Sequence, residues 1–577
     1  MLTLGIHDGH TATACLIENG EVIACISEER LNREKEWTGF PERSILKCLE
    51  ISGRSVSDIA AIGVCSLMPQ IGNKHYHNPQ GYKKAFGYLS TVLPEKVLQR
   101  SSNIGLIQKL SGRLFQERRD RIHKDLNSMG IGTQNVFFFE HHLCHAATAF
   151  YTNWFRPGKS LVLTLDGSGD AVCATVNIGE NGSLRRIAGV FNYNSICEFY
   201  TRVTQFLGMK PMSHEYKIMG MAPYASESRR KEVLDIFRKY FKVSSSDPLQ
   251  IINTSGRWKW QFMDGLTSDL TGKRFDWVAG AVQDLFEEVV LEWVRNAIKV
   301  SGCGDLALAG GGFMNVKINY LISKLPEVNS LFVFPSCGDE SNPVGAAILA
   351  ALRTGFQPND IKPLGMIYWG DEYSVEQVDS ALNNQLKSSE LRVSRYENIN
   401  SIVARKISEG KIAGRFTGRM EWGARALGNR SIVADPRNPG IIHRINKAIK
   451  MRDFWMPFAP AILQEYREKY LDLRKDYRCP FMTIAPDTKK EAWDAISAGL
   501  HPFDKSARAQ ILDPENHPSF YELVSEFEKI TGVGGVLNTS FNLHGDPIVC
   551  TPDDAIDTFL KSDLDILQLE NNLVEKA

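Results

Sequence analysis

A repeated layout of short strands and turns constrains this chain more than any other feature. An apolar run ends at the turn Asp8-Gly9, and two further apolar runs follow, separated by the turn Asn19-Gly20. The same layout recurs with Asp166-Gly167, 158 positions after the first turn, and with Asn181-Gly182. Asn-Gly turns suit hairpins because both residues tolerate a positive φ. We therefore predict two copies of one α/β unit, each opening with a β-meander; the alternative is two unrelated hairpins.

Duplicated meanders with an Asp-Gly turn resemble the actin-like ATPase and sugar-kinase superfamily (ASKHA), so the predicted fold class is α/β with a duplicated actin-like N-terminal domain. Residues 284–299 have helical periodicity, with an acidic start and a basic end that suit the helix dipole. A buried strand is predicted over 306–309 and a helix over 345–352. Glycine and proline residues over 354–364 predict a boundary between a domain at 1–355 and a second α/β domain at 366–577.

Composition limits the class of protein. The 577 residues are too many for one core, and 67 basic against 67 acidic side chains give a net charge of zero. Zero net charge argues against a partner that is long nucleic acid, since such proteins usually carry a positive excess. Eleven scattered cysteines without C-x-x-C indicate reduced thiols. With no basic, apolar leader and no long apolar run, we expect a soluble cytoplasmic protein without a membrane partner.

Histidines and carboxylates form a candidate metal site. An aromatic strand over 136–139 leads into a stretch that places His141 and His145 at i and i+4 of a predicted helix, on one face. Asp166 at the second Asp-Gly turn and Asp339 are the candidate carboxylate ligands. Two imidazoles with one or two carboxylates suit iron, manganese or zinc, and the ligand types do not decide among these metals. We expect His142 and Cys144, which lie between the histidine ligands, to face the core.

A glycine triplet follows the strand at 306–309. Gly310, Gly311 and Gly312 precede Phe313-Met314-Asn315, and such glycines let backbone N–H groups approach a nucleotide or an anion. The alternative is a plain strand-to-helix turn. The sequence has no G-x-x-x-x-G-K-[ST], which argues against P-loop chemistry.

The second domain carries a dense set of arginines among glycine and apolar residues, over 418–432 and on to 437 and 452. This pattern does not alternate as a solvated helix face would. Guanidinium groups match phosphate oxygens geometrically, so we expect some of these residues to converge on an anion. Arg419, Arg430 and Arg437 are expected to pair with local acids instead.

The chain as a whole resembles the O-carbamoyltransferases of antibiotic, toxin and nodulation-factor biosynthesis (the nodulation protein U and nebramycin 5′ synthase type). The motifs that carry the resemblance are D-G-H at 8–10, S-E-E-R at 27–30 with Lys35, H-H-x-x-H at 141–145, L-D-G at 165–167, E-Y-K-I-M-G at 215–220, G-G-G-x-x-N at 310–315, the Asp339 segment, G-A-R-A-L-G-N-R-S at 423–431 and N-T-S-F-N at 538–542. This family joins a Kae-like domain of the actin-like superfamily to a YrdC/Sua-like α/β domain.

The resemblance implies an ATP-dependent transferase of one-carbon groups. In the second domain, carbamoyl phosphate and ATP with Mg²⁺ would yield carbamoyl-adenylate. The first domain would then pass the carbamoyl group to a hydroxyl of a small natural product. This domain would bind a divalent metal, for which Fe²⁺ is the first choice. Asp8 or His10 would be the general base, and Asn315 would seat the acceptor. The residues that the resemblance assigns to the nucleotide and phosphates are Lys35, Gly311, Arg425, Lys450, Arg452, Arg508, Ser540 and Asn542.

Several alternatives stay open at this point. Lys217 either lines the acceptor pocket or pairs with Glu215. A transferase of the tRNA threonylcarbamoyl type has the same two folds, although zero net charge weighs against it. A hydrogenase-maturation carbamoyltransferase would need paired C-x-x-C zinc fingers, which the sequence lacks. A non-catalytic nucleotide-binding regulator would not need both a set of metal ligands and a second, phosphate-binding pocket. A homodimer is possible, and neither the acceptor nor its hydroxyl follows from the motifs.

Overall fold

The computed structural model describes residues 1–68, 112–386, 391–474 and 477–576. It divides into two compact units: Met1–Ala24 with Glu36–Gly365, and Cys25–Lys35 with Met366–Ala577. The short segment Cys25–Lys35 is thus counted with the second unit, although the chain on both sides of it belongs to the first. No helix in the described ranges is both long enough and apolar enough to cross a bilayer.

The first unit contains two five-stranded sheets with the same strand order. In the first sheet this order is β3-β2-β1-β4-β5, and in the second it is β8-β7-β6-β11-β12. Each begins with an antiparallel meander and continues with parallel strands. This equivalence confirms the predicted duplication and the α/β fold class. The strands are β1 (Leu2–His7), β2 (Thr13–Glu18), β3 (Glu21–Ser27), β4 (Ile59–Cys65), β5 (Val136–Phe139), β6 (Lys159–Gly169), β7 (Val172–Glu180), β8 (Ser183–Phe191), β11 (Asp305–Ala309) and β12 (Ser330–Val333).

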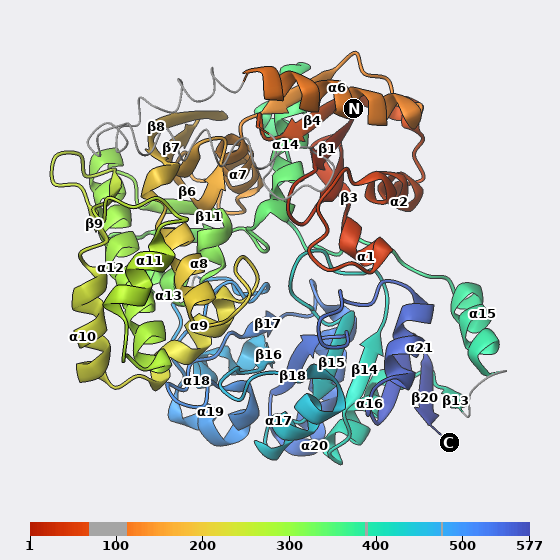
Figure 1. The fold of residues 1–577 in the computed structure, drawn as a ribbon. Coiled ribbons are helices and arrows are strands. Elements are labelled where there is room, and N and C mark those ends of the chain that lie inside the picture. The colour runs from red at the N-terminus through yellow and green to blue at the C-terminus, as the bar shows by residue number, and fades with distance from the viewer. Residues whose placement is uncertain (69–111, 387–390, 475–476, 577) are drawn as a thin grey trace. The chain divides into compact units, whose positions relative to one another are not determined.

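Two helices fill the space between these sheets. Helix α14 (Asn342–Arg353) packs on β1 and β4, and α7 (His141–Thr152) packs on β6 and against α14 (Figure 1). Glycines permit this close packing: a Cβ added at Gly5 would lie 1.8 Å from the carbonyl oxygen of Pro343, and one at Gly345 would lie 2.0 Å from that of Cys144. The predicted helix at 345–352 is therefore confirmed, and its small residues have a packing reason.

Of the other helices of the first unit, α2 packs on β2 and α8 packs on β6, whereas α9, α10 and α13 pack on α12, and α11 packs on α8. The predicted helix at 284–299 is part of the longer α12, which ends at Gly302, a residue with φ of 61°. The helices are α2 (Glu42–Ser52), α6 (Gly112–Ser128), α8 (Ile196–Phe206), α9 (Glu215–Met221), α10 (Glu227–Phe237), α11 (Phe262–Asp269), α12 (Phe275–Ser301) and α13 (Val316–Ser323), and a separate pair of strands comprises β9 (Phe241–Val243) and β10 (Ile251–Asn253).

The second unit is built on one mixed eight-stranded sheet, in the order β13-β20-β19-β14-β15-β18-β16-β17. Apolar clusters cover it, one around Val403, Leu523 and Phe527 and another around Phe416, Phe541 and Phe559. The strands are β13 (Leu391–Arg395), β14 (Ala413–Phe416), β15 (Arg430–Ala434), β16 (Ala459–Leu463), β17 (Gln510–Leu512), β18 (Gly535–Ser540), β19 (Ile566–Leu569) and β20 (Asn572–Lys576). The helices are α1 (Glu28–Asn32), α15 (Val375–Leu386), α16 (Ile399–Ser408), α17 (Gly440–Ile445), α18 (Arg467–Tyr470), α19 (Lys490–Ala495), α20 (Pro518–Thr531) and α21 (Pro552–Leu560).

Candidate metal centre and anion-binding cluster

The four predicted metal ligands come together in the first unit. His141 and His145 lie on the first turns of α7, Asp166 lies on β6, and Asp339 begins the 3₁₀ turn Asp339–Ser341 before α14. The Nε2 atom of His141 is 3.2 Å from Asp166 Oδ2 and 3.3 Å from Asp339 Oδ1. His145 Nε2 is 3.3 Å from Asp166 Oδ2 and 3.1 Å from His141 Nε2. Both imidazoles therefore present the same nitrogen to one point.

Local structure explains why α7 begins where it does. Glu140 is the N-cap, and its carboxylate accepts the Leu143 N–H at 2.7 Å. The strand β5 ends immediately before this cap, so both histidines lie in the first turns of the helix at i and i+4.

The donor set fits a divalent metal ion. One ligand atom from each of the four residues lies within 4.8 Å of all the others, with the imidazoles buried and the carboxylates partly exposed. Neutral imidazole and carboxylate together are the ligands of zinc, iron and manganese sites. The partial exposure of the carboxylates leaves an approach for a substrate.

The pKa shifts show how strongly these four groups interact. Burial and the neighbouring Asp339 raise the pKa of Asp166, but hydrogen bonds from His141 and His145 outweigh them and lower it to about 2. Burial lowers the pKa of His141, yet the charge of Asp339 and the hydrogen bonds that the imidazole donates to both carboxylates raise it well above its ordinary value. Two carboxylates at this spacing therefore favour positive charge between them, as a bound cation would supply.

Further side chains surround the ligands, and none of them was among the predicted site residues. Ser66 Oγ lies 3.1 Å from His141 Nδ1, and Ser341 Oγ lies 3.3 Å from His145 Nδ1. The buried His7 Nε2 is 3.7 Å from Asp339 Oδ2. Of these three, His7 alone had a sequence signal, since it precedes Asp8 in the first turn.

The residues between the histidine ligands face away from the metal site. His142 Nδ1 is 2.7 Å from Thr164 Oγ1, and its Nε2 is 3.1 Å from the Val172 carbonyl oxygen. Cys144 is buried in an apolar cluster. Burial and the two neighbouring imidazoles lower the pKa of His142 well below its usual value, so this histidine is held neutral.

The two candidate bases differ in their surroundings. Asp8 is buried and forms a two-pronged ion pair with Arg118 of α6: Nη2 lies 2.5 Å from Oδ1, and Nε lies 3.2 Å from Oδ2. His10 is partly exposed, and its carbonyl oxygen is 3.1 Å from His7 Nε2. The sequence offered no sign of Arg118, which lies 110 positions from its partner.

The predicted glycine and acceptor residues occupy distinct places. A Cβ at Gly311 would lie 3.0 Å from Asp166 Oδ1, so this glycine lies next to a candidate metal ligand. Asn315 caps α13, and its amide is 2.9 Å from Gln283 Oε1. Lys217 is partly exposed on α9, whereas the Glu215 carboxylate accepts hydrogen bonds from Thr201 and from the Met212 N–H.

In the second unit, a buried lysine is surrounded by polar groups of β18 and the loop after it. Lys450 ends a π-helical turn (Asn446–Lys450), and its Nζ donates to Asn542 Oδ1 at 2.7 Å and to Ser540 Oγ at 3.1 Å. Arg452 donates to Thr539 Oγ1 at 3.1 Å. Burial lowers the pKa of Lys450 well below its usual value, and the positive charges of Arg452 and Lys35 lower it further.

We define Lys35, Lys450 and Arg452 as the cation cluster. The positive charges of Lys35 and Arg452 repel the buried Lys450 ammonium group unless an anion balances them, which makes this cluster a candidate phosphate site. Lys35 reaches it because the segment Cys25–Lys35 belongs to the second unit.

The other arginines singled out in the sequence fall into two groups that differ in burial and in their partners. Arg425 and Arg508 are partly exposed. Arg430 is fully buried and donates to the carbonyl oxygens of Thr417 and Gly418, and Arg437 pairs with Asp435. Arg419 donates to the Gly370 carbonyl oxygen. These three arginines therefore have structural partners.

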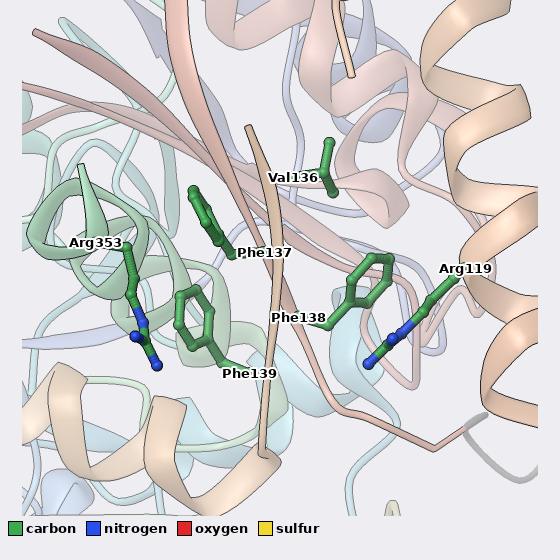
Figure 2. Close-up of a pocket in the computed structure, with 6 residues that line it drawn as sticks. All are labelled: Arg119, Val136, Phe137, Phe138, Phe139 and Arg353. Carbon is green, nitrogen blue, oxygen red and sulfur yellow. The ribbon is translucent and has the colours of Figure 1, made fainter. Parts of the chain in front are cut away.

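A cavity of about 290 Å³ lies beside the edge strand β5. Figure 2 shows its lining side chains, which are Arg119, Val136, Phe137, Phe138, Phe139 and Arg353. None of these belongs to the metal site or to the cation cluster. The cavity is therefore separate from both candidate sites.

Comparison with known proteins identifies the family. The carbamoyltransferase N-terminus family matches residues 2–348, and the carbamoyltransferase C-terminus family matches residues 404–576. The chain belongs to the carbamoyltransferase family. This carbamoyltransferase is an enzyme, and the predicted relationship to the O-carbamoyltransferases is confirmed.

Among its relatives, nodulation protein NolNO of Sinorhizobium fredii is 31% identical over 581 residues, covering 99% of this chain and 79% of its own. An uncharacterized protein of Methanocaldococcus jannaschii, MJ1058, is 33% identical over 498 residues, covering 80% of this chain and 79% of its own. A second one, MJ1051, is 30% identical over 589 residues and is matched over the full length of both chains.

Proposed function

We propose that this carbamoyltransferase forms carbamoyl-adenylate from carbamoyl phosphate and ATP in its second unit and transfers the carbamoyl group to a hydroxyl of a small metabolite in its first. One observation carries the proposal: a single chain has a histidine–carboxylate cluster that could hold a metal and, in the other unit, a cluster of cations. Activation of a phosphorylated donor and transfer to an alcohol need these two different environments.

The cation cluster is suited to the first step. Lys450 is buried, with its Nζ fixed by Ser540 and Asn542, while Lys35 and Arg452 add positive charge nearby. Bound phosphates would balance these charges and would accept hydrogen bonds from the same groups. Water would first cleave carbamoyl phosphate to carbamate and inorganic phosphate, and a carbamate oxygen would then attack the α-phosphorus of ATP. The bond from the α-phosphorus to the bridging oxygen breaks, and preorganised cations stabilise the negative charge that builds up on the departing pyrophosphate.

The metal site is suited to the second step. His141, His145, Asp166 and Asp339 would hold the metal, which when bound supplies Lewis-acid stabilisation of charge on a carbonyl oxygen. Gly311 keeps the space beside Asp166 free of a side chain. Asn315 and Lys217 remain the candidates for seating the acceptor.

We assign proton abstraction from the acceptor hydroxyl to His10. Both oxygens of Asp8 accept hydrogen bonds from the Arg118 guanidinium. An ion pair of this kind favours the ionised carboxylate and opposes protonation, which a general base must undergo. His10 is partly exposed and lies two residues further along the same turn.

The test separates the two steps. Purified protein incubated with carbamoyl phosphate, ATP and Mg²⁺ should release inorganic phosphate from the carbamoyl phosphate and pyrophosphate from the ATP, and should yield carbamoyl-adenylate, detected by mass spectrometry. Lys450→Ala should abolish this step, whereas Lys447→Ala, an exposed lysine of the same π-helical turn, should leave it intact. His141→Ala should retain adenylate formation and lose transfer to hydroxylated acceptors. Absence of carbamoyl-adenylate in the wild-type protein would refute the proposal.

A further inference from the structure

Ser66 has a strained backbone beside the metal site. It follows β4, is fully buried and has a φ of 71°. This left-handed conformation is uncommon for a residue with a Cβ, and it persists only where the surrounding structure fixes it.

Two buried charged groups fix the turn that contains Ser66. The Arg118 guanidinium donates to the carbonyl oxygen of Ser66 and, at 2.7 Å, to that of Cys65. The Asp170 carboxylate accepts the N–H groups of Leu67 at 2.8 Å and Met68 at 2.7 Å. Arg118 therefore holds the turn through its carbonyl groups, and Asp170 holds it through its N–H groups.

The same groups tie the turn to the metal ligands. Asp170 Oδ2 also accepts the backbone N–H of His141 at 2.8 Å, and Ser66 Oγ lies 3.1 Å from His141 Nδ1. The other ring nitrogen, Nε2, faces Asp166 and Asp339. A neutral imidazole carries its proton on one nitrogen only, so an acceptor at Nδ1 leaves a lone pair on Nε2.

Helix α6, which supplies Arg118, is anchored next to this turn. The guanidinium groups of Arg118 and Arg119 lie 5.8 Å and 5.1 Å from the centroid of the Phe138 ring on β5. Figure 2 shows Phe138 and Arg119 side by side. Cation–π contacts at these distances favour one position of the helix, and with it one position of Arg118.

We infer that Ser66 is a positioning residue for metal binding: its hydroxyl accepts the Nδ1 proton of His141, and the strained turn exists to place that hydroxyl. The inference rests on the proposed metal site and goes beyond its four ligands. Ser341 occupies the equivalent place at Nδ1 of His145, at 3.3 Å. Each histidine ligand thus has its own serine on the outer nitrogen, an arrangement that fixes the ring and its tautomer.

The test uses the full chain, freed of metal by a chelator and titrated with Co²⁺, whose visible absorption reports the ligand geometry. Ser66→Ala and Ser66→Gly both remove the hydroxyl, but glycine adopts a positive φ without strain. Both variants should bind Co²⁺ about 10- to 100-fold more weakly than the wild type, with an altered spectrum. The melting temperature of the metal-free Ser66→Gly protein should be at least that of Ser66→Ala.

The controls separate the possible failures. Ser323→Ala removes a buried serine hydroxyl that donates to the carbonyl oxygen of Tyr320 within α13, and it should leave Co²⁺ affinity unchanged. Wild-type affinity and spectrum in Ser66→Gly would overturn the inference while leaving the metal site itself intact. Absence of Co²⁺ binding by the wild type would instead refute the proposed metal centre. Ser341→Ala, which keeps ordinary backbone geometry, should weaken binding in the same way.

Discussion

Gly169 lies directly against the imidazole of His141: a Cβ built on this glycine would be 2.2 Å from the ring atoms Cγ and Cδ2. Glycine at this end of β6 therefore leaves the space that the ligand ring occupies. We expect Gly169→Ala to push the ring away from Asp166 and to reduce divalent-metal affinity by about tenfold or more, because ligand geometry sets affinity. Calorimetric metal titration checks this.

Gly158→Ala is the matched control for that change, since a Cβ there meets nothing within 4 Å. It should bind metal as the wild type does. Equal affinity of Gly169→Ala and wild type would mean that the ring can move without cost, which would contradict the prediction.

The buried ion pair of Asp8 and Arg118 gives a second prediction, about stability. Removing one partner leaves an uncompensated buried charge, so Arg118→Met should lower the free energy of unfolding by about 3–5 kcal/mol. The double variant Arg118→Met/Asp8→Asn should recover part of that loss. Arg54→Met, which breaks an exposed pair with Glu18, should cost about 0–1 kcal/mol. Urea denaturation measures all three, and similar losses for Arg118→Met and Arg54→Met would contradict the prediction.

A third prediction concerns acid. His517 is buried, and neither ring nitrogen has a hydrogen-bond partner among the described residues. Burial lowers its pKa to about 4, against a weaker opposing effect of Asp513. As the pH falls, the unfolded state takes up the His517 proton before the folded state does. The contribution of His517 to the free energy of unfolding is therefore constant above about pH 6.5 and decreases between pH 6.5 and pH 4.

The measurement compares melting at two pH values. Between pH 7.5 and pH 5.0, the free energy of unfolding should fall by about 2 kcal/mol less in His517→Phe than in the wild type. This is the amount expected from a pKa shift of this size. The difference in melting temperature between these pH values should shrink accordingly. An unchanged difference would show that other groups dominate the acid response.

A fourth prediction separates the two proposed steps by metal removal. A chelator selective for transition metals, used with Mg²⁺ present, should stop carbamoyl transfer and leave carbamoyl-adenylate formation intact, because the cation cluster contains no metal ligand set. Added Fe²⁺, Mn²⁺ or Zn²⁺ should restore transfer. Loss of both activities together would argue against separate sites.

The sequence was sufficient for features that depend on local periodicity. His141 and His145 could be placed on one helix face from their spacing, and Asp8 and Asp166 from turns that recur in two copies. The matching order of the two sheets follows from the same repeat.

Other parts of the site depend on contacts between distant segments. Arg118 meets Asp8 across 110 positions, and nothing in the pattern of α6 sets this arginine apart from its neighbours. The positive φ of Ser66 results from Arg118 and Asp170 holding its turn, so no glycine or asparagine marks it in the sequence. Tertiary contacts of this kind leave no periodic signal.

The segment Cys25–Lys35 means that the polypeptide passes between the two units three times, at 24/25, 35/36 and 365/366. Arg30 and Arg33 on this segment donate to the carbonyl oxygens of Gly423, Pro547 and Ile548, and Lys35 contributes to the cation cluster. A gene divided at codon 366 would therefore yield a C-terminal product that lacks Lys35 of the cation cluster and the three hydrogen bonds from Arg30 and Arg33. A second unit expressed by itself would therefore need residues 25–35 supplied together with residues 366–577.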